Sequence, residues 1–258
     1  MLPVEAKDKS GSTPSARHDQ AYRELRDLIV SGALPPGSPI IESTVADQLG
    51  QPRSLVRGAL QRLQIEGYVN SVIMKKYSRA VVAPLTAESV NELFTIMGAL
   101  EGLAARNVTA LDTESCQRIA AEMQEVNQAL QEASNGSPDQ QASAQDLHVR
   151  FHEVPVEAAA GTVLFDQIDR IKYQVERYER LYTHVLLSGI QDSVEEHAEI
   201  IAALRTQDPD AAQHATEANW RRGAERYQRA LATAGPRGTW NHSPPPLNRP
   251  GFAGDSNA

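Results

Sequence analysis

The stretch "STVADQLGQPRSLVRGALQRLQIEG", residues 43–67, contains two short helical segments separated by a tight turn. Gly50 ends the first segment, and Pro52 stands where a second helix can begin. Ser43 or Glu42 is a candidate cap for the first helix. The stretch therefore predicts two helices in close succession, which is the order of a helix-turn-helix.

The flanking segments extend this pattern on both sides. In "AYRELRDLIVSGAL", residues 21–34, apolar residues recur at helical spacing until Gly32, which predicts an amphipathic helix. In "YVNSVIMKKYSRAVVAPL", residues 68–85, β-branched residues surround a polar, basic middle, which predicts a two-stranded ribbon. Three helices followed by a ribbon are typical of a winged helix.

Composition limits the class of protein. The chain has 258 residues, of which 41% are hydrophobic, so it is long enough for two domains with a sizeable core. A single cysteine, Cys116, excludes an intrachain disulfide framework and CxxC zinc or redox motifs. We find no secretion signal and no apolar run near 18 residues, so we expect no membrane partner and a cytoplasmic location.

The charges are unevenly distributed along the chain. Residues 17–84 carry nine Lys and Arg against six Asp and Glu, a net charge of +3. Residues 85–258 carry fourteen against twenty-five, a net charge of −11. A small basic unit joined to a larger acidic one is typical of a nucleic-acid-binding module attached to a domain with another task.

Sequence composition divides the chain into four regions. We expect a flexible arm over 1–17, a winged helix-turn-helix over 18–84, an all-helical domain over 85–234 and a disordered Pro-rich tail over 235–258. The fold class is therefore mainly α. Five breaks in the third region separate six expected helices, near 86–109, 113–133, 139–159, 162–187, 191–206 and 209–234. Their apolar stripes predict a helical bundle.

The predicted second helix of the helix-turn-helix carries two arginines suited to DNA. Arg53 and Arg57 are four residues apart and share a face near the helix start, and arginine's forked donors match guanine or phosphate. An ordinary solvated helix face is the alternative. Further candidates for contacts with the DNA backbone or minor groove lie beside this helix and on the ribbon: Ser43, Ser54, Lys75, Lys76 and Arg79.

The stretch "LRDLIVSGALPPGSPIIESTVADQLGQPRSLVRGALQRLQIEGYV", residues 25–69, resembles the DNA-binding domain of the GntR family of bacterial transcription regulators. The resemblance implies that Arg53 and Arg57 contact operator DNA. Two departures concern the operator preference: Pro52 replaces the usual small cap, and the ribbon is longer and lacks the usual Arg-Gly tip.

Two further stretches, "AESVNELFTIMGALEGLAARNV" and "SVEEHAEIIAALRTQDPDAAQHATEANW", resemble the FCD domain of the FadR-like GntR regulators. The resemblance implies a bundle of six or seven helices that dimerises and binds a small, usually acidic metabolite. Such domains often hold a divalent metal beside that metabolite.

The stretch "QDLHVRFHEV", residues 145–154, places His148 and His152 four apart, so both imidazoles can meet one metal ion, and His197 can supply a third ligand. By resemblance, His148 stands where the family has Asp, and Asn219 where it has His. Without that carboxylate, zinc or nickel is favoured over magnesium, although the site could also be weak or empty. The alternatives are histidines hydrogen-bonded in the core, or His214 in place of Asn219.

The expected effector pocket lies beside these histidines. Arg170, Arg177 and Arg180 recur on one predicted helix and are candidates to bind a carboxylate, with Tyr182 as a hydroxyl donor. The alternative is a charged outer or dimer-facing surface. Met97 stands where the family usually has Arg, which predicts a less anionic effector or a different partner for Glu101.

The leading hypothesis is therefore a homodimeric transcription regulator, expected to be a repressor, that binds double-stranded operator DNA at the bacterial nucleoid. Its bundle would bind a small metabolite, expected to be an organic acid, beside a divalent metal. One alternative is a metal-dependent enzyme that uses the histidines. Another is a DNA-binding protein whose bundle only dimerises.

Overall fold

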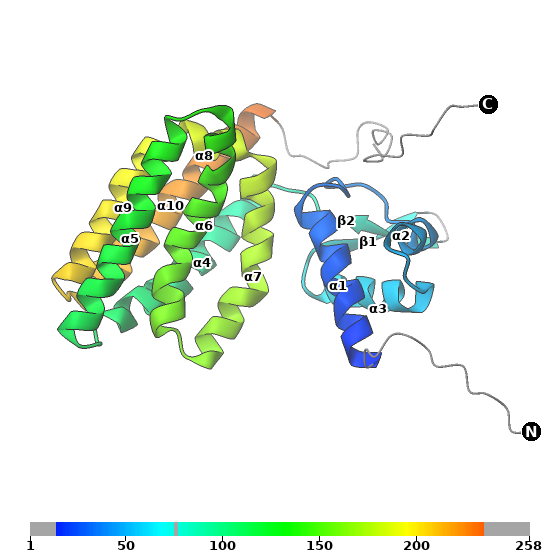
Figure 1. Ribbon diagram of the computed structural model, residues 1–258. Helices are drawn as coiled ribbons and strands as arrows, with labels where there is room; N and C mark the ends of the chain where they lie inside the picture. Colours follow the sequence, from blue (N-terminus) through cyan, green and yellow to red (C-terminus); the bar gives the residue numbers. More distant parts are fainter. Residues whose placement is uncertain (1–13, 75–76, 235–258) are drawn as a thin grey trace, which may run out of the picture. The chain divides into compact units, whose positions relative to one another are not determined.

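The structure, a computed structural model, describes residues 14–74 and 77–234. These residues form two compact units that divide between Ala83 and Pro84. Figure 1 shows the short helices and the small ribbon of the first unit, and the long helices of the second. The mainly α fold predicted from the sequence is confirmed.

The first unit has the helix-helix-helix-ribbon order of a winged helix. Its helices are α1 (Pro14–Val30), α2 (Glu42–Leu49) and α3 (Arg53–Ile65), and its strands are β1 (Val69–Met74) and β2 (Tyr77–Val82). The strands pair antiparallel from Val69↔Val82 to Met74↔Tyr77. The helix α1 begins inside the arm that was expected to be flexible, and residues 1–13 of that arm lie outside the described residues.

The turn between α2 and α3 forms for the reasons that the sequence indicates. Gly50 adopts a left-handed conformation with φ 61°, and its N–H donates to the carbonyls of Ala46 and Asp47. Pro52 precedes the first residue of α3 with an extended ψ of 140°. The predicted cap of α2 is wrong, because Ile41 takes that position with no side-chain hydrogen bond. The Glu42 carboxylate instead accepts hydrogen bonds from Arg57.

The second unit is a bundle of long helices. They are α4 (Ala87–Val108), α5 (Thr113–Ser134), α6 (Pro138–Ala159), α7 (Thr162–Leu181), α8 (Thr183–Ser188), α9 (Ile190–Arg205) and α10 (Pro209–Ala234). The helix expected over 162–187 is interrupted at Tyr182, whose φ of −126° and ψ of 36° are not helical. Thr86 and Asp112 cap α4 and α5 by accepting from the N–H groups of Ser89 and Ser115.

The helices α4 and α10 approach each other closely at glycines of α4. A Cβ atom on Gly98 would lie 2.8 Å from the Trp220 Cβ atom, which is closer than two carbon atoms can pack. A Cβ atom on Gly102 would lie 3.2 Å from the side chain of Gln213. These glycines therefore allow the bulky Trp220 side chain to be buried between the two helices.

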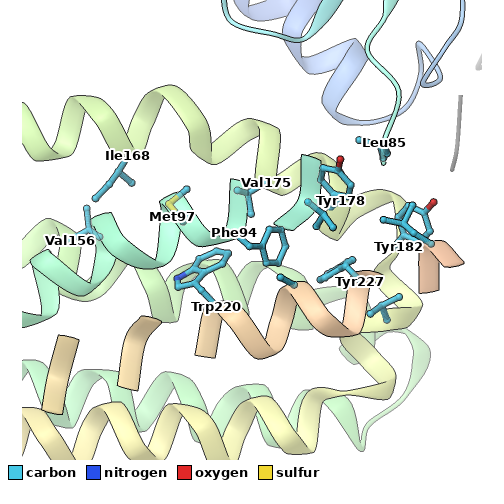
Figure 2. Packing of buried hydrophobic residues seen from close by; sticks show 14 of the residues in the cluster. Leu85, Phe94, Met97, Val156, Ile168, Val175, Tyr178, Tyr182, Trp220 and Tyr227 are labelled. Atoms are coloured by element: carbon cyan, nitrogen blue, oxygen red, sulfur yellow. The ribbon is translucent and has the colours of Figure 1, made fainter. Parts of the chain in front are cut away.

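An aromatic cluster fills the core beside this contact. Phe94 packs edge to face against Tyr178, Trp220 and Tyr227, with ring centroids 5.2–6.4 Å apart. Figure 2 shows these rings together with Met97 and Val175, and all of them come from α4, α7 and α10. Burial of each such side chain contributes about 1.5–3 kcal/mol, so the cluster anchors the three helices to one another.

Among the described residues, no helix is both long enough and apolar enough to span a bilayer.

Candidate functional site

The start of α3 carries the residues that the sequence assigns to DNA contact. Arg53 and Ser54 are exposed in its first turn, where the helix also presents free N–H groups. Arg57 is exposed one turn later and forms an ion pair with Glu42, with 2.9 Å between the guanidinium Nη2 and a carboxylate oxygen. The α3 helix therefore presents two arginine side chains to solvent, one unpaired by any described carboxylate and one held by Glu42.

The remaining residues that were predicted to contact DNA differ in their exposure to solvent. Ser43 is half-buried in the first turn of α2. Arg79 is exposed on β2, opposite Val72 of β1. Lys75 and Lys76, at the turn of the ribbon, lie outside the described residues.

The three histidines come together inside the bundle. His148 and His152 on α6 and His197 on α9 each offer a ring nitrogen, and these nitrogens lie within 4.8 Å of one another. All three side chains are buried, and no other group of three or more His, Cys, Asp or Glu in the described part of the chain has metal-binding spacing. The Phe151 ring stacks on His197 at 3.7 Å, which fixes the orientation of that imidazole.

Hydrogen bonds set the tautomers of two of the three imidazoles. His152 Nδ1 lies 2.9 Å from the Glu101 carboxylate, which accepts, so this Nδ1 carries the proton. His197 Nδ1 lies 2.9 Å from Asn127 Oδ1, and the Asn127 amide NH₂ donates elsewhere, to the Val194 carbonyl. In both rings the Nε2 lone pair therefore remains for a ligand, which is how metal-binding histidines are usually held.

Two buried nitrogens of the cluster form no hydrogen bond within the described structure. They are His197 Nε2 and His148 Nδ1, and the latter lies 3.6 Å from a Glu179 carboxylate oxygen. A buried polar atom without a partner costs free energy unless a ligand, ion or water satisfies it. The cluster is therefore incomplete as a purely structural hydrogen-bond network.

Burial also keeps the imidazoles of His148 and His197 neutral. It holds the pKa values of His148 and His197 well below 6.5, and electrostatic interactions with His152 and Arg226 lower them further. A metal ion requires neutral imidazoles, so no proton has to be removed at neutral pH. The same Arg226 charge opposes a bound cation, which limits the affinity of the cluster.

Asn219, the fourth residue of the expected site, is held by a charged network on α9 and α10. Its amide NH₂ donates to Glu196 Oε2 at 2.9 Å, and Glu196 forms an ion pair with Arg226 at 2.8 Å. Asn219, His148 and His152 line the same void of about 20 Å³, which has room for one water molecule. The site therefore offers three nitrogens and space for water, with the Asn219 amide oxygen nearby.

A larger cavity of about 300 Å³ shares His148 and His152 with this small void. The helices α4, α6, α7 and α10 form its walls. Its apolar and aromatic lining includes Met97, Val156, Phe165, Ile168, Tyr173, Val175 and Trp220. Its charged lining consists of Glu101, Glu153, Glu157, Asp169, Glu176 and Glu179 together with Lys172.

Of the residues predicted to bind an effector, only Met97 lines this cavity. Arg170 and Arg180 are exposed, and Arg180 pairs with Glu176. Arg177 and Tyr182 are buried but do not belong to the lining. The structure therefore does not bring the predicted arginines and Tyr182 together at the cavity.

The sequence reasoning missed the cavity-lining residues of α7. Phe165, Asp169, Lys172, Glu176 and Glu179 recur at intervals of three and four residues, so they share one face of the helix. Each arginine that was predicted instead, Arg170, Arg177 or Arg180, directly follows a lining residue and so lies about 100° around the helix from it. The spacing is visible in the sequence, but arginines were predicted instead because a carboxylate ligand was expected.

Family models match both units of the chain. The model described as "Bacterial regulatory proteins, gntR family" matches residues 17–75, and that described as "FCD domain" matches residues 92–222. A helix-turn-helix transcriptional regulator of Agrobacterium vitis is 30% identical over 148 residues, which cover 57% of this chain and 82% of that protein. The transcriptional repressor RspR of Escherichia coli K12 is 26% identical over 77% of this chain and 83% of its own length.

A similar fold occurs among solved structures. The E. coli protein McbR/YncC superposes with a TM-score of 0.62 at 21% identity, over 83% of this chain and 98% of that one. At this level of identity the likeness concerns the fold alone.

Proposed function

The chain belongs to the GntR family of bacterial transcription regulators, with the family's DNA-binding domain followed by an FCD domain, and on this premise we propose that it is a homodimeric repressor controlled by a metal and a small molecule. It is a transcription regulator rather than an enzyme, as its relatives are. The observation that carries the proposal is the set of three buried imidazoles beside a cavity, in the domain that follows the DNA-binding unit.

The DNA-binding unit would read an operator through the start of α3. In a helix-turn-helix the second helix enters the major groove, and its first turns reach base edges. Arg53 and Ser54 are exposed there, and Arg57 is one turn away. The Arg57–Glu42 ion pair is exposed and therefore weak, so phosphate or guanine can compete for the guanidinium. Ser43, Arg79, Lys75 and Lys76 remain candidates for backbone contacts.

The metal proposal rests on the donor set. His148, His152 and His197 supply three imidazole nitrogens, a set that suits zinc or nickel better than magnesium. Glu101 and Asn127 hold the imidazoles of His152 and His197 in the tautomer that leaves Nε2 available. Water or the Asn219 amide oxygen would complete the coordination. A bound ion would link α6 to α9.

Control of transcription would follow from the different affinities of the small molecule for two arrangements of the dimer. A ligand shifts that equilibrium only by the difference in its affinity for the two states. Typical couplings between such sites change the second affinity about 5- to 150-fold. We therefore expect the cavity ligand to change operator affinity within that range.

The experiment that tests this function starts without a known operator. Duplexes are selected from a random library with the full-length protein, and binding to the selected duplex is measured by fluorescence anisotropy at fixed salt. We expect a palindromic site bound by a dimer, with affinity changed by zinc or nickel. A protein that selects no sequence, or whose dimers bind all duplexes alike, would refute the regulator proposed here.

Metal analysis separates a sensor from a bundle that only dimerises. The untagged protein is loaded with zinc or nickel, desalted and analysed for bound metal. About one ion per chain supports the proposal. If the protein takes up neither metal, the proposed metal site is wrong. Dimerisation and ligand binding in the cavity then remain as the proposed roles of the bundle.

A further inference from the structure

The charge of the 300 Å³ cavity is unlike that of a site for an acid. Six carboxylates line it, and Lys172 is the one Lys or Arg among the lining residues. The outer carboxylates have cationic partners: Glu157 pairs with Arg150, Glu176 with Arg180, and Asp169 with Lys172. Since Lys172 is shared between Asp169 and the nearby Glu153, it cannot neutralise both.

The inner wall of the cavity is also acidic. Glu101 and Glu179 are 5% and 4% exposed, and both belong to the lining. Glu101 accepts hydrogen bonds from His152 and from the Trp220 indole N–H, at 2.9 and 2.7 Å. Both contacts use Glu101 as an acceptor, so a carboxylate ligand at this wall would meet a group that offers it no donor.

A second, independent feature of the cavity is a buried ring nitrogen without a hydrogen-bond partner. His148 is 9% exposed and belongs to the lining, and its Nδ1 atom forms no hydrogen bond within the described structure. A neutral imidazole has one nitrogen that accepts. An ammonium N–H reaching this wall could donate to His148 and to the adjacent carboxylate oxygens together, whereas a carboxylate would find few donors there.

The rest of the lining suits an apolar body attached to such a charge. Met97, Val156, Ile168 and Val175 converge from three helices, and the Trp220 ring lies on the α10 side of the same space (Figure 2). Aromatic faces such as that of Trp220 attract cations as well as apolar groups. A volume of about 300 Å³ is at the lower end of small-molecule sites.

We infer that the cavity binds an organic cation, a primary or secondary amine in its ammonium form on a compact apolar body. This ligand class replaces the organic acid expected from the sequence. The ammonium group would lie at the wall formed by Glu101, Glu179 and His148, and the apolar body would extend between α4 and α7. The inference rests on the proposed function only for the consequence that such a ligand regulates DNA binding.

The test compares isosteric probes of opposite charge. Metal-free, full-length protein, prepared by chelation, is titrated with phenethylamine and with 3-phenylpropionate, and then with cyclohexylmethylamine and cyclohexanecarboxylate, at constant ionic strength and pH 7.5. Thermal denaturation and calorimetry are recorded for each. We expect the amines to raise Tm by several degrees in a concentration-dependent way, because a ligand that binds only the folded state stabilises it, and the acids to leave Tm unchanged.

A matched pair of variants tests the electrostatic cause. Glu153→Lys reverses a charge in the cavity wall, at a half-buried position without a described ion-pair partner. Glu225→Lys makes the same change at an exposed position of α10 that does not line the cavity. We expect at least about a 10-fold weaker affinity for the amines in the first variant and an unchanged affinity in the second.

Two results would overturn the inference: stabilisation by the acids that equals or exceeds that by the amines, or no stabilisation by any amine of the panel. The proposed role as a regulator is tested separately, by measuring binding to the selected duplex. If the amines do not bind but operator binding is intact, only the proposed ligand class, an organic cation, is wrong. If the amines bind but the protein selects no operator, only the proposed role in transcription is wrong.

Discussion

The start of α3, which we propose contacts DNA, and the histidine cluster place their functional groups in opposite environments. Arg53, Ser54 and Arg57 extend into solvent, where their contacts with the rest of the chain are few and weak. His152 and His197 are buried and hydrogen-bonded to Glu101 and Asn127, on helices far away in sequence. The exposed groups can therefore change without affecting the fold, whereas the buried ones cannot change without affecting their neighbours.

The largest effect should follow removal of His197, the proposed metal ligand on α9. His197→Ala deletes one of three imidazoles, and we expect zinc affinity to fall by more than about 100-fold, beyond the ~10- to 100-fold that loss of an outer hydrogen-bond partner costs. The measurement is competition with a chromophoric zinc chelator. His214→Ala, at an exposed histidine of α10, is the control and should bind zinc like the wild type.

Two other results with His197→Ala would contradict this view of the histidine cluster. If His197→Ala retained wild-type zinc affinity, the cluster would be an ordinary buried network. If it lost operator affinity in metal-free buffer, the cluster would act on DNA binding through the fold and not through a metal.

The next effect concerns the exposed end of α3. Arg53→Ala should weaken binding to the selected duplex by about 5- to 150-fold if the guanidinium reads a base, because a bidentate contact discriminates by that factor. Tm should stay unchanged, since Arg53 has no described ion-pair partner to lose. Anisotropy at fixed salt measures the first quantity and thermal denaturation the second.

The control for this variant is Arg118→Ala, which removes an equal charge from an exposed position of α5 in the bundle. Equal losses of affinity in the two variants would mean that only the total charge matters. An unchanged affinity in Arg53→Ala would remove α3 from the interface.

The difference between the two regions also explains what the sequence could predict. The start of α3 depends on local signals: Gly50, Pro52 and arginines four apart, all within one short segment. The cluster required three residues to be matched across α6 and α9, and the spacing of His148 and His152 supplied two of them. Periodicity did not point to the third, His197, which was a candidate because of its side-chain chemistry and which the family resemblance then matched by position.

The partners of the cluster could not be predicted in the same way. Glu101 and Asn127 lie 51 and 70 residues from the histidines that they bind, and nothing in their local sequence marks them as buried acceptors. The break at Tyr182 was missed because the surrounding residues continue a helical pattern, and packing interrupts it. The charge of the cavity was missed because it is the sum of contributions from α4, α6 and α7.

A smaller effect tests how tightly the fold supports the cavity. Gly98→Ala forces a Cβ atom to within 2.8 Å of Trp220, and overpacking of this kind costs about 1–3 kcal/mol. This cost exceeds the gain of up to ~1 kcal/mol that alanine brings to a helix. Urea denaturation should therefore show a net loss of stability, and displacement of Trp220 should also weaken ligand binding in the cavity.

Gly223→Ala on α10 is the matched control. Its Cβ atom would lie 3.5 Å from Phe94, an ordinary contact, so the helix propensity of alanine should leave the stability equal or higher. If both variants were stabilised, the close approach of α4 and α10 at Gly98 would not constrain the bundle.

The smallest effect is the pH dependence of the buried groups. Burial lowers the pKa values of His148 and His197 well below 6.5, so below that pH the unfolded chain binds two protons that the folded chain does not, and stability falls. Burial raises the pKa of Glu179 from 4.5 to about 7, so between those values the folded chain binds one extra proton, and this group opposes the loss. In this range the unfolded chain therefore binds about one proton more than the folded chain. The free energy of unfolding then falls by ~1.4 kcal/mol for each unit by which the pH is lowered.

Glu179→Gln separates the two contributions. The variant lacks the group that takes up a proton on folding, so the loss of stability below pH 6.5 should become about twice as steep as in the wild type, while the stability at pH 8 should rise. Urea denaturation of metal-free protein between pH 5.5 and 8 measures both slopes. Glu225→Gln, at an exposed carboxylate, should leave the slope unchanged. Equal slopes in Glu179→Gln and wild type would mean that the cavity wall is more hydrated than its burial implies, and the contrast with the solvated end of α3 would weaken accordingly.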